Sequence, residues 1–161
     1  MLTPFVIALS FLGILAGVII SKFTKEELKP GKKWFSMLEN CLMLAIGIVI
    51  IFYTQEFSLF FMPGLVAGFF FRRVYFYLGM ALPLASESFL VALASLTFII
   101  GLPKGTLLAS ELKNKDKIKK EIFMSGVFFF AAAIASYLIG YEPLLIFASG
   151  ALVMSWFVAK A

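Results

Sequence analysis

The chain has no histidine and contains only one cysteine, Cys41, and one aspartate, Asp116, among its 161 residues. Without histidine, one chain cannot assemble the usual zinc sites, a histidine-ligated haem or a Ser-His-Asp triad. A lone cysteine excludes an intrachain disulfide and a dithiol redox pair, and a lone aspartate excludes the paired aspartates of intramembrane proteases. We therefore predict no catalytic residue, no metal and no cofactor, and enzymatic activity is left open as the less favoured class.

Charged residues are also scarce in this chain. They make up 14% of it, against 62% apolar residues and a mean hydropathy of +1.03, whereas a soluble domain carries about a quarter charged residues. A helical span needs ~20 apolar residues, so nearly every residue must lie in a span or in a short connection. The sequence therefore predicts an all-α, multi-pass integral membrane protein of the cell membrane, with one transmembrane domain over residues 1–161.

The apolar runs give six or seven spans, depending on how the run Val74–Leu102 is read. As one helix this run would be roughly 43 Å long, against a hydrocarbon core of about 30 Å. As two shorter spans it turns at Ser86-Glu87-Ser88, just after Pro83. The seven-span reading places short transmembrane helices at Phe5–Ser21, Met37–Tyr53, Phe57–Phe71, Val74–Ala85, Phe89–Leu102, Ile122–Gly140 and Pro143–Ala159.

The positive charges favour seven spans. With the N-terminus outside and the C-terminus inside, all 14 basic residues fall on the inner side, and the outer turns hold only Glu56, Glu87 and Glu142. Short inner loops rich in Lys and Arg are what the positive-inside rule predicts. A six-span chain would instead place one lysine-rich loop outside. No basic residue precedes the first apolar run, so we expect this run to be a retained span and not a cleaved signal peptide.

The inner loops indicate which partners to expect. The stretch Thr106–Ile122 carries apolar residues near helical spacing with lysines between them, and it predicts an amphipathic inner helix or an extension of the sixth span. Such lysines attract anionic lipid headgroups by about 1 kcal/mol each. Because orientation already explains the positive charge, we expect no nucleic acid partner. A homo-oligomer is left open.

An internal repeat relates the two halves of the chain. At an offset of 84 residues Gly17 aligns with Gly101, and the string Glu27-Leu28-Lys29 aligns with Glu111-Leu112-Lys113. At an offset of 86 residues both halves end in the pattern E-x-x-L-x-F-x-x-G. Coincidence is the alternative, because apolar sequences often match by chance. The repeat predicts a parallel 3+1+3 plan, with three helices in residues 5–73, a connecting helix in residues 74–88 and three helices in residues 89–161.

This 3+1+3 plan resembles in topology the SWEET and PQ-loop transporters and the nicotinamide riboside carriers. The resemblance implies a transporter architecture but no site residues, because the chain lacks the proline-glutamine pair that names the PQ-loop group. A microbial rhodopsin is rejected, since its retinal Schiff base needs a lysine in the middle of the last span and Lys160 stands at the very end.

Glu39 and Asn40 lie about one turn inside the second predicted span. A carboxylate there costs ~1 to 3 kcal/mol or more unless it faces protein or water. One interpretation is a binding or proton-relay group on the inner side. The other is a glutamate that reaches the interface or offsets the charges of Lys32 and Lys33.

Two further polar groups are candidates for a solute or ion pathway. Ser86, Glu87 and Ser88 could form a site in a water-filled outer cavity, or they are a plain hydrophilic turn. Arg72 and Arg73 close the third predicted span. Arginine can clamp a carboxylate or phosphate with two hydrogen bonds, but an inner-face anchor that sets orientation is the favoured interpretation.

Glycine and proline mark helix contacts and bends. Gly64 and Gly150 would let helix backbones approach closely. Pro83 removes a backbone hydrogen bond within a helix and is the best candidate for a kink or hinge.

The sequence therefore favours a small membrane transporter or permease for a small solute or ion, in which two three-helix bundles rock about a site between them. The alternative is a non-transporting membrane module, such as a lipid-binding or assembly subunit of a larger complex. Its support is the shortage of polar residues in the spans and the 20 phenylalanines, which suit contact with lipid or with other helices.

Overall fold

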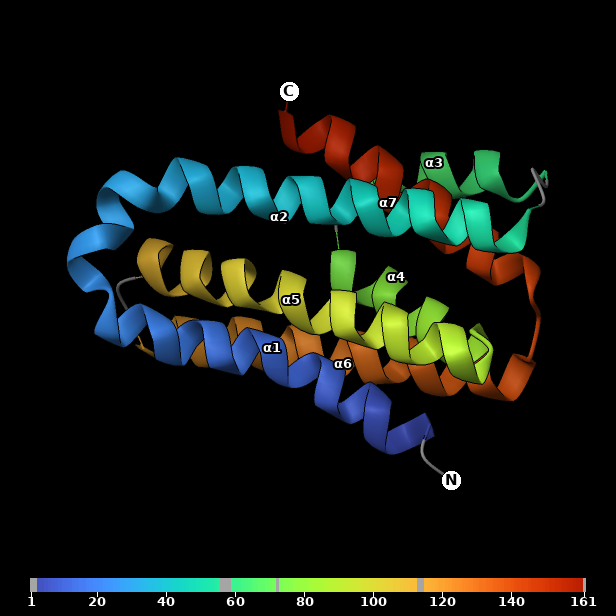
Figure 1. Cartoon of the computed structure of the whole chain (residues 1–161), viewed down its shortest axis with the longest axis horizontal. Helices are drawn as coiled ribbons and strands as arrows, with labels where there is room; N and C mark the ends of the chain where they lie inside the picture. Colours follow the sequence, from blue (N-terminus) through green and yellow to red (C-terminus); the bar gives the residue numbers. More distant parts are fainter. Residues whose placement is uncertain (1–2, 56–58, 72, 113–114, 161) are drawn as a thin grey trace.

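The computed structural model describes residues 3–55, 59–71, 73–112 and 115–160. All regular structure in these residues is helical, and it forms an elongated bundle (Figure 1). The helices are α1 (Thr3–Phe23), α2 (Lys25–Thr54), α3 (Phe61–Phe70), α4 (Val74–Ala81), the 3-10 turn η1 (Leu82–Leu84), α5 (Glu87–Glu111), α6 (Lys115–Ile139) and α7 (Pro143–Lys160).

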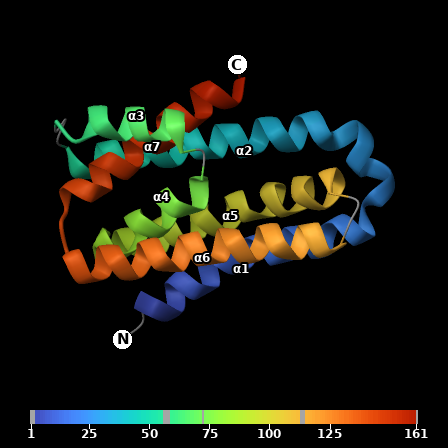
Figure 2. The ribbon, with the colours of Figure 1, turned by 180° about the vertical axis from the view of Figure 1, so that it is seen from behind.

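Successive helices run in opposite directions along the bundle. In both views α1, α3, α5 and α7 point one way and α2, α4 and α6 point the other way (Figures 1 and 2). We call one end of the bundle the acidic end, because Glu87 begins α5 there and Glu142 precedes α7. The opposite end is called the basic end, because Lys22 in the last turn of α1 and the exposed Lys117 on α6 lie there.

Four of the described helices are long and apolar enough to cross a membrane: α1, the part of α2 from Pro30 to Thr54, α5, and α6 from Asp116 onward. Large apolar side chains such as Phe5, Phe52 and Leu138 are exposed on their surfaces. An exposed apolar area of this extent would be costly in water and is what contact with lipid requires. The fold is therefore that of a membrane-embedded helical protein.

The helices α3 and α4 are shorter than the sequence predicted. With 10 and 8 residues they are roughly 15 and 12 Å long, about half of a hydrocarbon core or less. Both lie in the half of the bundle near the acidic end, and the chain passes from one to the other partway along the bundle (Figure 2). Together α4 and η1 cover Val74–Leu84 of the predicted span Val74–Ala85, whereas the span predicted at Phe57–Phe71 is an α-helix from Phe61 to Phe70, and its residues 57–58 lie outside the described residues.

The run Val74–Leu102 is divided. The helix α4 ends at Ala81, Pro83 lies in the 3-10 turn, and Ser86 is extended before α5 begins at Glu87. Because proline lacks a backbone donor, α4 ends at this point, and Pro83 does not kink a continuous helix.

Two helices extend beyond the predicted spans on the inner side. The helix α2 begins at Lys25 and contains Pro30 in its early turns, so the segment before Met37 is not a loop. The helix α5 continues through Pro103 to Glu111, which places Lys104 on a helix. Of the two alternatives for Thr106–Ile122, the extension of the sixth span is confirmed from Lys115 to Ile122, which form the start of α6, while Thr106–Glu111 form the end of α5 and not a separate helix.

Glycines set close backbone contacts between α1 and α5, between α3 and α7 and, at Gly79 and Phe129, between α4 and α6. Between α1 and α5, a Cβ atom on Gly13 would overlap the carbonyl group of Phe98, and one on Gly105 would overlap that of Ile14. The Thr106 hydroxyl group donates a hydrogen bond of 3.1 Å across this contact to the carbonyl oxygen of Gly17. Glycine permits such close backbone approach between helices in a membrane.

The contact between α3 and α7 has the same character. A Cβ atom on Gly64 would overlap the carbonyl oxygen of Phe147. On the opposite helix, a Cβ atom on Gly150 would lie 2.5 Å from the carbonyl oxygen of Phe61. The two helices therefore pack backbone to backbone.

Candidate functional site

A cavity of about 290 Å³ lies in the half of the bundle near the basic end. We call it the basic-end cavity. Its polar lining comes from Arg73 and Tyr75 at the start of α4, Lys104 and Glu111 on α5, and Glu121 and Ser125 on α6. Because α3 and α4 reach only partway along the bundle, no α4 residue stands between the basic-end halves of α5 and α6. The cavity occupies this space, and the start of α4 closes it.

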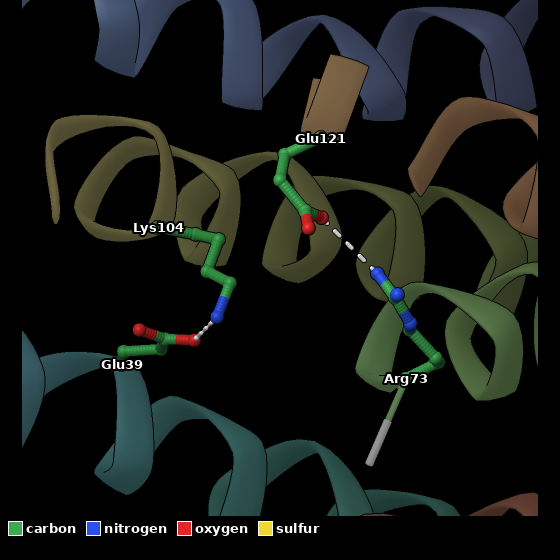
Figure 3. A network of polar contacts seen from close by, with 4 residues as sticks. All are labelled: Glu39, Arg73, Lys104 and Glu121. Carbon is green, nitrogen blue, oxygen red and sulfur yellow. Dashed lines mark hydrogen bonds and ion pairs between the residues drawn. The ribbon is translucent and has the colours of Figure 1, made fainter. Parts of the chain in front are cut away.

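Glu39 is buried beside this cavity and paired with Lys104. Its Oε1 atom lies 2.9 Å from Lys104 Nζ, and the residue is only 8% exposed (Figure 3). The pair joins α2 to α5. The charge of Lys32, which the sequence offered as a partner for Glu39, is instead paired with Glu111 at 3.0 Å between exposed side chains.

Arg73 forms a second ion pair within the cavity. Its Nη1 atom donates a hydrogen bond of 3.1 Å to Oε2 of Glu121 on α6 (Figure 3). The guanidinium carbon also lies 5.4 Å from the centre of the Phe128 ring, a distance at which a cation and an aromatic face attract each other. The sequence placed Arg73 at the inner face, whereas in the structure α3 ends short of the basic end and Arg73 faces the cavity.

The Tyr75 hydroxyl group is the unusual polar atom of this region. Tyr75 is 5% exposed and lines the cavity, and its hydroxyl group has no hydrogen-bond partner among the described residues. The ring packs edge-on against Phe11 and Phe129. Buried polar atoms are hydrogen-bonded in the great majority of cases, so a buried hydroxyl group without a partner beside a cavity is unusual.

A second cavity, of about 510 Å³, lies at the acidic end. We call it the acidic-end cavity. Tyr53 and Thr54 of α2, Ser86, and Glu142 line it together with the first residues of α7. Glu87 and Ser88 are exposed and do not line it, so the structure brings only one residue of the predicted Ser86-Glu87-Ser88 group to the cavity.

The helix α4 separates the two cavities. Its first residues line the basic-end cavity, and the residues after η1 line the acidic-end cavity. Between them Tyr77, Leu78, Ala81 and Leu82 are at most 1% exposed. Both cavities are therefore closed toward each other by the buried middle of α4.

The remaining predicted site residues lie elsewhere. Asn40 borders a surface hollow with Cys41 and Trp156, apart from the basic-end cavity. Gly64 and Gly150 lie in the contact between α3 and α7, and Pro83 lies in η1. Arg72 is outside the described residues.

Sequence reasoning did not select Lys104, Glu121, Tyr75 or Ser125 as site residues. Lys104 and Glu121 both lie in the inner segment between the predicted spans that end at Leu102 and begin at Ile122. One signal was present: Glu39 is an acid inside an apolar run, and such an acid requires a cationic partner. The sequence does not say which lysine or arginine that partner is.

Comparison with protein-family models, with curated proteins and with solved structures finds no match for this chain. The function must therefore be argued from the cavities themselves. Among the described residues no group of three or more Cys, Asp or Glu side chains is placed to hold a metal ion. What the basic-end cavity offers is hydrogen-bond donors, carboxylates and apolar walls.

Proposed function

We propose that the chain is a small polytopic transporter or permease for a small solute or ion. The observation that carries this proposal is the pair of cavities at opposite ends of α4, closed from each other by the buried residues Tyr77, Leu78, Ala81 and Leu82. A transporter needs a site that is reached from one side at a time, and charged groups within a membrane bundle commonly mark such a pathway.

The proposal includes an orientation with the N-terminus outside and the C-terminus inside the cell membrane. It is supported by the exposed lysines at the basic end and by Glu87 and Glu142 at the acidic end. The α3–α4 pair starts and finishes at the acidic end (Figure 2). Because the chain returns to the acidic end in either case, the other helices keep the same orientation whether α3 and α4 cross the membrane or only enter it. Lysines at the basic end are suitably placed for anionic lipid headgroups.

The parallel repeat is part of the same proposal. Gly64 packs on Phe147, and Gly150 packs on Phe61. In the repeat, Gly64 is equivalent to Gly150 and Phe61 to Phe147, each at the offset of 86 residues. The helices α1 and α5 run in the same direction, as do α3 and α7. Reciprocal contacts of this kind are what a two-fold axis along the bundle would produce.

The helix contacts favour a local opening for the transport movement. The most extensive contacts, those of α1 with α5 and of α3 with α7, join the two halves of the repeat, while α1 and α2 touch little. Few contacts within each three-helix bundle favour a local movement over the rocking of whole bundles. We therefore replace that mechanism with the opening of α2 from α5, where the ion pairs Glu39–Lys104 and Lys32–Glu111 hold the two helices together.

The test is uptake by proteoliposomes that contain only this purified chain. A panel of labelled amino acids, sugars and inorganic ions is supplied to the wild type and to the Glu39→Gln variant. We expect at least one solute to enter with the wild type and its uptake to fall at least tenfold in the variant, because glutamine keeps the size of the side chain and removes its charge.

The Lys119→Gln variant is the matched control, since Lys119 is an exposed lysine on α6 outside the cavity. Its uptake should equal that of the wild type. Unchanged uptake in Glu39→Gln would remove Glu39 from the pathway. If no solute enters and the chain copurifies with another membrane protein, the non-transporting module is the better description.

A further inference from the structure

We infer that the basic-end cavity binds a small zwitterion, a molecule with one ammonium group, one oxyanion group and an apolar body. This inference names the substrate class of the proposed transport site and so rests on that proposal, although binding can be measured without transport.

The charge balance of the site is the first argument. Arg73 is paired with Glu121, Lys104 with Glu39, and Lys32 with Glu111, so the six side chains carry no net charge. An inorganic anion that took Lys104 would leave the buried Glu39 without a cation. An inorganic cation bound to Glu39 would place a second positive charge beside the Lys104 ammonium group. Uncompensated charge in a buried site is strongly unfavourable.

A zwitterion avoids this penalty because it brings both charges. Its oxyanion replaces a glutamate carboxylate on Arg73 or Lys104, and its ammonium group pairs with the carboxylate that has been displaced. The number of ion pairs in the cavity then stays the same or rises. The site therefore discriminates by net charge as well as by shape.

Arg73 is suited to the oxyanion. The bond to Glu121 uses one guanidinium nitrogen, Nη1, and a guanidinium group has five donors in a planar fork that matches a carboxylate or phosphate. The Phe128 ring, 5.4 Å from the guanidinium carbon, can hold Arg73 in place when Glu121 moves to the ligand's ammonium group.

The Tyr75 hydroxyl group is an independent observation that points to a ligand. It is buried, it has no partner among the described residues, and its residue lines the cavity that contains Arg73 and Lys104. Because Tyr75 lines the same cavity as Arg73 and Lys104, its hydroxyl group can donate a hydrogen bond to an oxyanion that reaches it.

The size and walls of the cavity limit the body of the molecule. A volume of about 290 Å³ has room for roughly ten water-sized groups, at about 30 Å³ for each. Ile14, Leu108 and Phe128 provide apolar walls. A branched aliphatic amino acid fits this description, and L-leucine is therefore the probe.

The experiment compares three molecules with the same isobutyl group on the purified full-length chain in detergent. L-Leucine carries both charges, isocaproate carries only the carboxylate, and isoamylamine carries only the ammonium group. We expect leucine to bind by calorimetry and to raise the thermal midpoint, with an affinity at least tenfold above that of either analogue. Isocaproate binding as tightly as leucine, or no binding by any zwitterion tested, would overturn the inference.

Variants assign the binding to this cavity. Arg73→Gln and Glu121→Gln should each weaken leucine binding at least tenfold, and Lys119→Gln should leave it unchanged. Tyr75→Phe should weaken binding while the thermal midpoint without ligand stays the same, because the hydroxyl group it removes has no partner in the described structure. Leucine binding that is insensitive to Arg73→Gln, Glu121→Gln and Tyr75→Phe would place the site elsewhere and overturn the inference.

A lipid headgroup is a second source of the same chemistry, since phosphatidylethanolamine also carries an ammonium group and an oxyanion. Glycerophosphoethanolamine is therefore tested beside leucine. Binding of this molecule alone supports a zwitterion site and assigns it to lipid.

Two further outcomes separate this inference from the transport proposal. Leucine binding without leucine uptake by proteoliposomes would contradict the transport proposal only. Uptake of another solute without any zwitterion binding would contradict this inference only.

Discussion

Glu39 is the one charged residue that is buried among the described residues. Its partner Lys104 is less enclosed, with 40% of its side chain exposed toward the cavity. The two residues therefore depend on the ion pair to different degrees. Glu39 has no other means of compensating its charge, whereas the long Lys104 side chain can turn its ammonium group toward water.

This difference predicts an asymmetry between two substitutions. Lys104→Gln should lower the free energy of unfolding by about 1–3 kcal/mol, because it leaves a buried carboxylate without a cation. Glu39→Gln should lower it by less than about 1 kcal/mol, because the lysine that remains is partly solvated. Denaturant unfolding of both variants in the same micelles provides the measurement.

The double variant is the control for this pair. In the Lys104→Gln background, Glu39→Gln removes the stranded charge and should recover most of the lost stability. An equal effect of the two single substitutions, or the reverse order, would mean that Glu39 reaches water and is not enclosed as described.

At the scale of the helices, glycine contacts and helix length determine the arrangement. The close contacts of α1 with α5 and of α3 with α7 are made where a glycine meets the backbone of the opposite helix. The short α3 and α4 leave open the space that becomes the basic-end cavity. A change at a glycine contact should therefore affect the whole bundle.

We predict that Gly105→Ala lowers the free energy of unfolding by about 1–3 kcal/mol. The added Cβ atom would overlap the carbonyl oxygen of Ile14, and overpacking of this kind forces the backbones apart. The measurement is again denaturant unfolding in micelles.

Gly126→Ala on α6 is the matched control. Its Cβ atom would lie 3.3 Å from the end of the Phe11 ring, which can shift, and alanine favours the helix over glycine by up to about 1 kcal/mol. This variant should therefore be as stable as the wild type or more so. Equal stability of Gly105→Ala and Gly126→Ala would show that α1 and α5 do not approach as closely as described.

At the scale of the whole molecule, the opposite charges of the two bundle ends predict its orientation. In a Cys41→Ser background, Glu87→Cys at the acidic end should react with an impermeant thiol reagent added to intact cells. Lys117→Cys at the basic end should react only after the cells are permeabilised. Both original residues are exposed, and lysine-rich segments are retained on the inner side.

The background protein without an introduced cysteine should not be labelled, which checks the reagent. Labelling of Lys117→Cys from outside would reverse the orientation. Lys117 is a suitable inner probe because it is exposed near the start of α6.

The sequence was sufficient to predict the class of the molecule and most helix positions. The apolar composition and the long runs predicted membrane-embedded helices, and α1, α6 and α7 overlap the spans predicted for them. The division after Pro83 was visible in the sequence because an undivided helix over Val74–Leu102 would exceed the bilayer thickness. These features depend on local properties, namely hydropathy, proline and run length.

The site itself was decided by tertiary structure. An apolar run has the same composition whether it faces lipid or protein, so hydropathy could not show that α3 and α4 end partway along the bundle and leave a cavity. It also could not show that Glu39 meets Lys104, because these residues lie on α2 and α5 and meet only when those helices pack together. The sequence contained every charge of the site, but the packing of the helices determined which charges were paired and which hydroxyl group, that of Tyr75, was left without a partner among the described residues.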